Sequence, residues 1–233
     1  MEGIDPMNLK EIILNLLFPP KCPCCMALQS RPGICPTCEG ELSRTAGKAI
    51  LRTGPGGLRC AAPLWYEGPG REALLRLKFQ GMASAAEPLG DQIARCAAEE
   101  FSGEFDTVTW VPVSRRRLRS RGYDQAQLLA RAACRHWGVK PVRLLKKTVD
   151  NQPQSGLRDE SARRANVLGV YDPVDPGKIV GRRILLVDDI CTTGATLTEC
   201  IRVLKDAGAA DVVCAAVAHT RERAHEKSKS SQK

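Results

Sequence analysis

The sequence has few aromatic residues, few histidines and no long apolar run. Aromatic residues make up 4% of the 233 residues, so platforms for stacking nucleic-acid bases are scarce, and Tyr123 is the candidate nearest a basic segment. The three histidines, His136, His219 and His225, form no catalytic or metal-binding pattern with cysteines, serines or acids. No stretch approaches the roughly 20 apolar residues that a membrane-spanning helix needs. We therefore expect neither a membrane span nor a histidine-centred site.

Positive charge is abundant. The formal net charge is +9, with 35 Lys and Arg against 26 Asp and Glu, which favours anionic ligands, either phosphorylated sugars or nucleic acid. A hydrophobic fraction of 43% supports a substantial core, and the length allows one α/β domain plus a small module.

Eleven cysteines are present. Several of them, Cys96, Cys134, Cys200 and Cys214, lie singly within apolar segments, as buried reduced thiols do. This pattern indicates a reducing compartment, and we predict a cytoplasmic protein.

Four other cysteines have the spacing of a zinc site. Cys22, Cys25, Cys35 and Cys38 form the pattern C-x2-C-x9-C-x2-C, in which two turns bring four thiolates around one Zn²⁺. Cys24 could replace Cys25 as a ligand. Because four protein ligands leave no open coordination position, we predict a structural zinc module over residues 22–42.

The segments around this module are less informative. Residues 1–21 are expected to hold a leader and a short amphipathic helix, since Leu9, Ile12 and Leu16 share one helical face. Glycines and little periodicity over residues 43–58 indicate a linker. Residues 59–220 would form the main domain, and the charged residues 221–233 a disordered tail.

The most informative stretch begins with four bulky apolar residues, from Ile184 to Val187. This run predicts a parallel strand that is buried on both faces. Asp188 and Asp189 follow, then a short loop with hydroxyls and a glycine, and then helical periodicity from Ala195 to Leu204. The loop residues that could hold a phosphate through backbone N–H groups and hydroxyls are Thr192, Thr193, Gly194, Ala195 and Thr196.

The two carboxylates would repel a phosphate unless they accept hydrogen bonds from sugar hydroxyls or face a divalent cation. Phosphate, diol and Mg²⁺ together indicate a phosphorylated pentose. A Walker-type loop is excluded because no Gly-Lys-Ser/Thr follows the glycine. The stretch resembles the 5-phosphoribosyl-1-diphosphate (PRPP) motif of type I phosphoribosyltransferases, which implies that Asp188 and Asp189 are catalytic and hold the ribose hydroxyls.

A basic segment follows another predicted strand, residues 106–113. Arg115 and Arg121 belong to a run of arginines that would lie at the same edge of the sheet and bind the diphosphate of PRPP. The same run could be a solvated loop or a contact for a phosphodiester backbone. Lys78 could be a solvated helix residue or a further phosphate ligand.

The remaining periodicity predicts a coarse order of elements. Helices are expected over residues 71–79, 83–101, 125–137 and 158–166, strands over 60–66, 142–145, 167–171 and 211–218, and a mobile loop over 146–157.

Several stretches together resemble the ComF family. Besides the cysteine pairs and the Asp188-Asp189 loop, the matching residues are Leu77-Lys78-Phe79-Gln80-Gly81, Val111-Pro112-Val113, Arg121-Gly122-Tyr123-Asp124-Gln125-Ala126, Gln154-Ser155-Gly156-Leu157 and Arg163-Arg164-Ala165-Asn166. Many relatives have Asn where this chain has Asp124. The exchange would weaken a contact with an anionic ligand, or be harmless if the residue caps the next helix.

The resemblance implies a type I phosphoribosyltransferase-like α/β fold, a parallel five-stranded core with helices on both faces, after a small four-cysteine zinc module. It implies PRPP with Mg²⁺ as ligand, structural Zn²⁺, phosphoribosyl transfer to an acceptor, and a link to natural competence and DNA uptake. A second interpretation is a non-catalytic protein that senses PRPP or binds single-stranded DNA, with a competence helicase as partner.

Overall fold

The computed structural model describes residues 19–45, 49–52, 57–150 and 168–220. The predicted helix near residues 9–17, the helix over 158–166, the tail over 221–233 and the motifs beginning at Gln154 and Arg163 lie outside the described residues. None of the described helices has the length and apolar character that a bilayer crossing requires.

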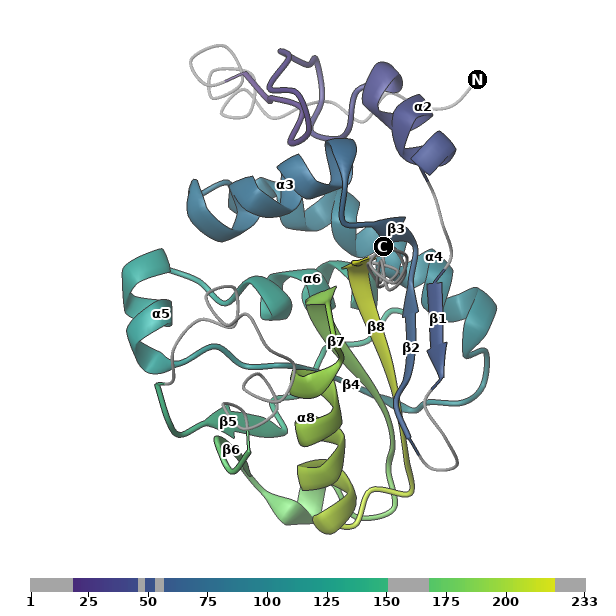
Figure 1. The fold of residues 1–233 in the computed structure, drawn as a ribbon, viewed down its shortest axis with the longest axis vertical. Coiled ribbons are helices and arrows are strands. Elements are labelled where there is room, and N and C mark those ends of the chain that lie inside the picture. Colours follow the sequence, from purple (N-terminus) through teal and green to yellow (C-terminus); the bar gives the residue numbers. More distant parts are fainter. Residues whose placement is uncertain (1–18, 46–48, 53–56, 151–167, 221–233) are drawn as a thin grey trace, which may run out of the picture.

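A six-stranded sheet forms the centre of the protein (Figure 1). The strands lie in the order β1 (Ala49–Arg52), β2 (Arg59–Ala62), β8 (Asp211–His219), β7 (Arg183–Cys191) and β4 (Thr107–Trp110), and β3 (Leu64–Trp65) also pairs with β8. All pairs are parallel except β1 with β2. The predicted parallel core is confirmed. The antiparallel β1 lies within the segment that was expected to be a linker.

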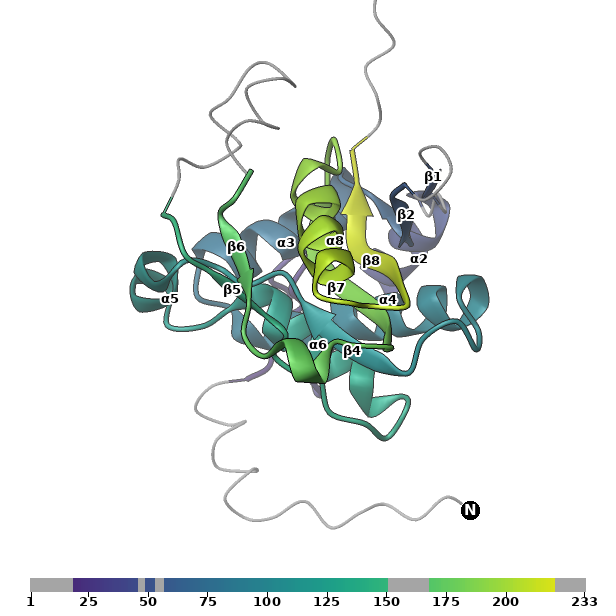
Figure 2. The same ribbon diagram turned by 90° about the horizontal axis from the view of Figure 1, so that it is seen from below.

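Helices cover both faces of this sheet (Figures 1 and 2). On one face lie α4 (Ala86–Glu100) and α6 (Gln125–Arg135), and on the other lies α8 (Ala195–Asp206). In β7, Leu185 and Val187 join the core cluster that contains α4 and α6, whereas Ile184 and Leu186 join the cluster that contains α8. Each of these four residues is at most 1% exposed, which confirms a strand buried on both faces.

The first face also carries α3 (Gly68–Phe79) and the short 3-10 helix η1 (Ala83–Ala85). Helix α2 (Pro36–Thr45) packs on α3 and carries the last predicted zinc ligand, Cys38 (Figure 1). The helix predicted after Gly70 is confirmed, but it begins earlier, at Gly68, because Pro69 suits the first turn of a helix.

Two predictions near the basic segment were wrong. The run expected to be a loop is a helix, α5 (Arg115–Arg121), which Ser114 caps by accepting from Arg117 N and which ends at Gly122 with φ +81°. These are ordinary helix end signals, but α5 buries no residue and so lacks apolar periodicity.

The strand expected over residues 142–145 instead forms β5 (Leu145–Lys147), which pairs with β6 (Tyr171–Pro173) and occupies the start of the expected mobile loop. A 3-10 helix, η3 (Pro176–Lys178), leads from β6 to β7.

Candidate functional site

The acidic pair lies within β7 and not after it. The strand continues through Asp188 and Asp189 to Cys191, where it still pairs with β8. Because side chains alternate along a strand, the two carboxylates face opposite sides of the sheet. Asp188 follows Leu186 on the side of α8, and Asp189 follows Val187 on the side of α6.

Asp189 has two protein partners. Its Oδ1 lies 2.9 Å from Lys78 Nζ, and its Oδ2 accepts a hydrogen bond of 2.9 Å from Gln125 Nε2. The residue is 4% exposed. Lys78 is therefore not a solvated lysine, since its charge neutralises Asp189. Its role as a phosphate ligand stays a prediction.

Asp188 has a different environment. Its Oδ1 accepts a hydrogen bond of 2.8 Å from the backbone N of Asp189. Burial raises the pKa of Asp188 well above its usual range, the charge of Asp189 raises it further, and Lys78 opposes both. A cation or a hydroxyl donor beside this carboxylate would favour its charged form.

The predicted phosphate loop lies between β7 and α8. Gly194 precedes α8 with φ +74°, a conformation that favours glycine. A Cβ atom at this position would lie 2.4 Å from Leu58 Cδ2, so the buried Leu58 side chain would have to shift to admit a larger residue. Thr193 Oγ1 accepts from Ala195 N at 3.5 Å. The first N–H groups of α8 thus follow the carboxyl end of β7, an arrangement suited to an anion.

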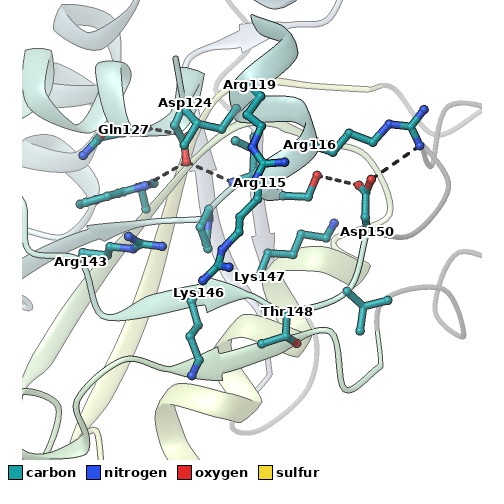
Figure 3. A pocket seen from close by; sticks show the side chains of 16 residues that line it. Arg115, Arg116, Arg119, Asp124, Gln127, Arg143, Lys146, Lys147, Thr148 and Asp150 are labelled. Atoms are coloured by element: carbon teal, nitrogen blue, oxygen red, sulfur yellow. Dashed lines mark hydrogen bonds and ion pairs between the residues drawn. The ribbon is translucent and has the colours of Figure 1, made fainter. Parts of the chain in front are cut away.

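A pocket of about 590 Å³ lies beyond the carboxyl end of β4, between α5 and β5. Its apolar lining residues include Trp110, Pro112 and Val113. Figure 3 shows cationic side chains reaching it from α5, from β5 and from the segment between α6 and β5. Six of them line it: Arg115, Arg116, Arg119, Arg143, Lys146 and Lys147. We call this space the basic pocket.

The charge of the basic pocket is only partly neutralised. Arg116 lies 3.8 Å from Asp150, which also accepts from Ser114 Oγ at 2.6 Å. Lys146 lies 3.9 Å from Asp172. Within the described ranges, the guanidinium groups of three lining residues form no ion pair: Arg115, Arg119 and Arg143. An anion would remove this imbalance.

Lys147 is a largely buried cation of the basic pocket. Burial and then the charge of Arg117 lower its pKa to about 8, while the charges of Asp150 and Asp188 act in the opposite direction. Arg143, Lys146 and Lys147 were not predicted as site residues, although the basic composition of residues 140–147 was an available signal.

Asp124 acts as a helix cap and as an anchor for β4. Its carboxylate accepts hydrogen bonds from Gln127 N, Val113 N and Trp110 Nε1 at 3.2, 3.1 and 3.3 Å. Burial raises the pKa of Asp124, and these donors oppose the rise. The sequence left two interpretations of Asp124, a contact with an anionic ligand or a cap of the next helix. The structure confirms that Asp124 caps α6.

Arg121 does not line the basic pocket. It donates to Gln125 Oε1 and its guanidinium lies 5.5 Å from the centre of the Phe79 ring. The two arginines proposed for the diphosphate are thus separated: Arg115 faces the pocket, and Arg121 supports the residue that holds Asp189.

The four predicted zinc ligands come together. The Sγ atoms of Cys22, Cys25, Cys35 and Cys38 all lie within 4.8 Å of one another, close to the separation of about 3.8 Å that tetrahedral zinc–thiolate bonds of about 2.3 Å require. Burial would raise the pKa of Cys22, but hydrogen bonds from backbone N–H groups lower it to about 6, which favours the thiolate. Cys24 lies outside this group, and burial raises its pKa to about 12. The residues therefore fit Zn²⁺, with Cys25 in the set.

Comparisons with known proteins agree with this arrangement. A family model described as "Phosphoribosyl transferase domain" matches residues 120–232. The competence protein ComFC of Bacillus subtilis is 28% identical over 189 residues, which cover 81% of this chain and 73% of that protein. ComFC of Streptococcus pneumoniae is 32% identical over 184 residues, which cover 76% and 77%.

Among solved structures, a glutamine PRPP amidotransferase from B. subtilis is 20% identical and covers 60% of this chain and 30% of that chain. Its TM-score of 0.41 is too low to support an argument about function.

Proposed function

Because the chain belongs to the ComF family, we propose that it binds PRPP with Mg²⁺ and transfers the phosphoribosyl group to an acceptor. One observation carries this proposal: β4 and β7 are neighbouring parallel strands, and their carboxyl ends carry the basic pocket, the acidic pair and the glycine loop. Ligands of open parallel sheets bind at this edge.

Each part of PRPP has a group of suitable chemistry. The 5-phosphate fits the backbone N–H groups of residues 192–196 at the start of α8. The ribose hydroxyls fit Asp188, with Asp189 holding the end of β7 in place. The diphosphate fits Arg115 and the other cations of the basic pocket. Mg²⁺ would be held through a carboxylate and PRPP oxygens, and would neutralise charge on the leaving diphosphate.

The transfer step needs no covalent intermediate with the protein. A nucleophile of the acceptor forms a bond to C1 of the ribose while the bond from C1 to the diphosphate oxygen breaks, and the electron pair leaves with diphosphate. The residues of this chain contribute by orienting the sugar and by stabilising the negative charge that develops on the leaving group. Since the relatives are named competence proteins, we propose that this activity serves DNA uptake.

Calorimetric titration of Mg²⁺–PRPP into the zinc-loaded protein tests the binding step. We expect one site per chain, loss of most of the affinity in Asp188→Asn, and unchanged affinity in Asp206→Asn. Asp206 is a matched control because it lies at the far end of α8, where its carboxylate pairs with Arg202. Release of diphosphate across a panel of bases and amines then tests transfer. Binding without release would support the non-catalytic, sensing function instead.

A single-stranded phosphodiester is the second candidate ligand. It is favoured by α5, which presents Arg115, Arg116 and Arg119 and buries none of its residues. Such binding would weaken as salt rises, and replacing Arg116 and Arg119 by Gln would reduce the slope of log affinity against log salt by about 0.7 per lost phosphate contact. An unchanged slope would remove α5 from this role.

A further inference from the structure

Helix α3 contacts the four-cysteine module through Arg76. The Nη1 atom of Arg76 donates to the carbonyl oxygens of Pro23 and Cys24 at 3.0 and 2.7 Å. These carbonyls belong to the turn between Cys22 and Cys25, two of the four clustered thiols. The side chain of Arg76 is 14% exposed, so this contact is largely shielded from water. The Nη2 atom of Arg76 also lies 3.9 Å from Glu72 Oε2.

The same helical turn contacts the acidic pair. Lys78 follows Arg76 by two residues and ion-pairs with Asp189 at 2.9 Å. Between the two contacts the helix has little freedom to rotate, because Leu74 and Leu77 are fully buried in the core that also contains Cys22 and Cys38. One rigid turn thus joins the cysteine cluster to β7.

A second segment, which joins α5 to α6, holds this turn from the other side. The Tyr123 hydroxyl donates to the Leu77 carbonyl at 2.6 Å, and Arg121 stacks on Phe79. Arg121 also donates to Gln125, whose Nε2 reaches Asp189. Both oxygens of Asp189 are therefore occupied, one from α3 and one from α6.

We propose that Arg76 and Lys78 are positioning residues that couple the metal state of the four-cysteine module to the geometry of the acidic pair. With Zn²⁺ bound, the turn at Pro23 and Cys24 is fixed and offers Arg76 two carbonyls. Without it, the module has little apolar core of its own to hold that turn. Arg76 then loses its acceptors, the end of α3 loosens, and Lys78 no longer holds Asp189 in one place.

Hydrogen exchange without PRPP tests the coupling itself. Removing Zn²⁺ with a chelator should speed amide exchange in the cysteine module, in residues 68–79 and at residues 188–191. Arg76→Gln should speed exchange in the last two regions by about tenfold with one Zn²⁺ still bound per chain, as a chromogenic chelator would report. Arg76→Lys, which keeps donors for the carbonyls, should restore part of the protection.

Arg71→Gln is the matched control. Arg71 lies on the same helix, but its guanidinium pairs with Glu72 at 2.8 Å, lies near the Tyr66 ring and is 47% exposed. Its replacement should leave exchange at residues 188–191 unchanged. If zinc removal frees the cysteine module and exchange at residues 188–191 stays at the zinc-bound rate, the coupling is absent.

The consequence for PRPP rests on the proposed function. Arg76→Gln should weaken Mg²⁺–PRPP binding about fivefold to tenfold with zinc content unchanged, and Arg71→Gln should not weaken it. If Arg76→Gln binds Mg²⁺–PRPP with the affinity of the wild type, the coupling does not affect ligand binding and this part of the proposal is wrong. If the wild-type protein binds no PRPP, the proposed function fails, while the exchange experiment still decides whether the two regions are coupled.

Discussion

The two aspartates of β7 are adjacent in sequence but have opposite environments. Asp189 is neutralised by Lys78 and bonded to Gln125 on the side of α6. Asp188 faces α8, receives one backbone N–H and has a raised pKa because burial disfavours its charge. From this difference we propose a division of roles, in which Asp189 maintains the structure of the strand end and Asp188 contacts the ligand.

The largest expected effect is a loss of stability when the ion pair between Lys78 and Asp189 is removed. Lys78→Met leaves the buried carboxylate of Asp189 without its cation, so the free energy of unfolding should fall by about 3–5 kcal/mol in urea denaturation. The double variant Lys78→Met/Asp189→Asn should recover most of this loss. Equal stability of the single and double variants would show that the ion pair does not hold the strand end.

The next largest effect is expected on PRPP affinity when Asp188 is replaced. Asp188→Asn should weaken Mg²⁺–PRPP binding by about 2 kcal/mol, roughly thirtyfold, because charge-assisted hydrogen bonds to the sugar or to the cation are lost. Its stability should equal or exceed that of the wild type, because a carboxyl group whose charged form is disfavoured by its surroundings is replaced by a neutral amide. A large loss of stability in Asp188→Asn would mean that both aspartates are structural.

The loop on the side of Asp188 should tolerate change poorly. Gly194→Ala places a Cβ against Leu58 at a backbone conformation with φ +74°, and should lower the free energy of unfolding by about 1–2 kcal/mol. PRPP affinity should fall as well, because the N–H groups at the start of α8 shift. Gly177→Ala is a useful control, since Gly177 has an ordinary φ and its nearest neighbour is a side-chain oxygen of Asp175 at 3.3 Å. Equal effects of the two substitutions would contradict a special role for the loop.

The smallest expected effect is the uptake of a proton by Lys147 when PRPP binds. Burial lowers the pKa of Lys147 to about 8, and a bound diphosphate would raise it, so binding near pH 8 should take up a fraction of a proton. The sign follows directly: affinity should be highest below pH 8 and should decline as pH rises through that value. Titrations in buffers of different ionisation enthalpy would measure the uptake, and it should vanish in Lys147→Met. If the proton uptake persists in Lys147→Met, a group other than Lys147 takes up the proton.

Local patterns predicted the elements that carry their own signals. The apolar run from Ile184 to Val187 identified β7, the loop from Thr192 to Thr196 identified the start of α8, and the cysteine spacing identified a cluster that the structure brings together. In each case the determining residues lie close together along the chain or repeat a known spacing.

Long-range contacts were not predictable in this way. Lys78 pairs with Asp189, which lies on a strand remote in sequence, and no sequence pattern near Lys78 predicts this partner. Helix α5 was missed because its stability depends on end caps and not on an apolar face. The separation of Arg115 from Arg121 follows from that helix, since it turns one toward the basic pocket and the other toward Gln125.

A crystal structure of the zinc-loaded protein with Mg²⁺ and PRPP tests the central claim most directly. We expect the 5-phosphate against the backbone N–H groups of residues 192–196, the ribose hydroxyls near Asp188, and the diphosphate toward Arg115, with the ion pair between Lys78 and Asp189 intact. PRPP bound away from β7, or a ribose held by Asp189 after release from Lys78, would contradict the division of roles between the two aspartates.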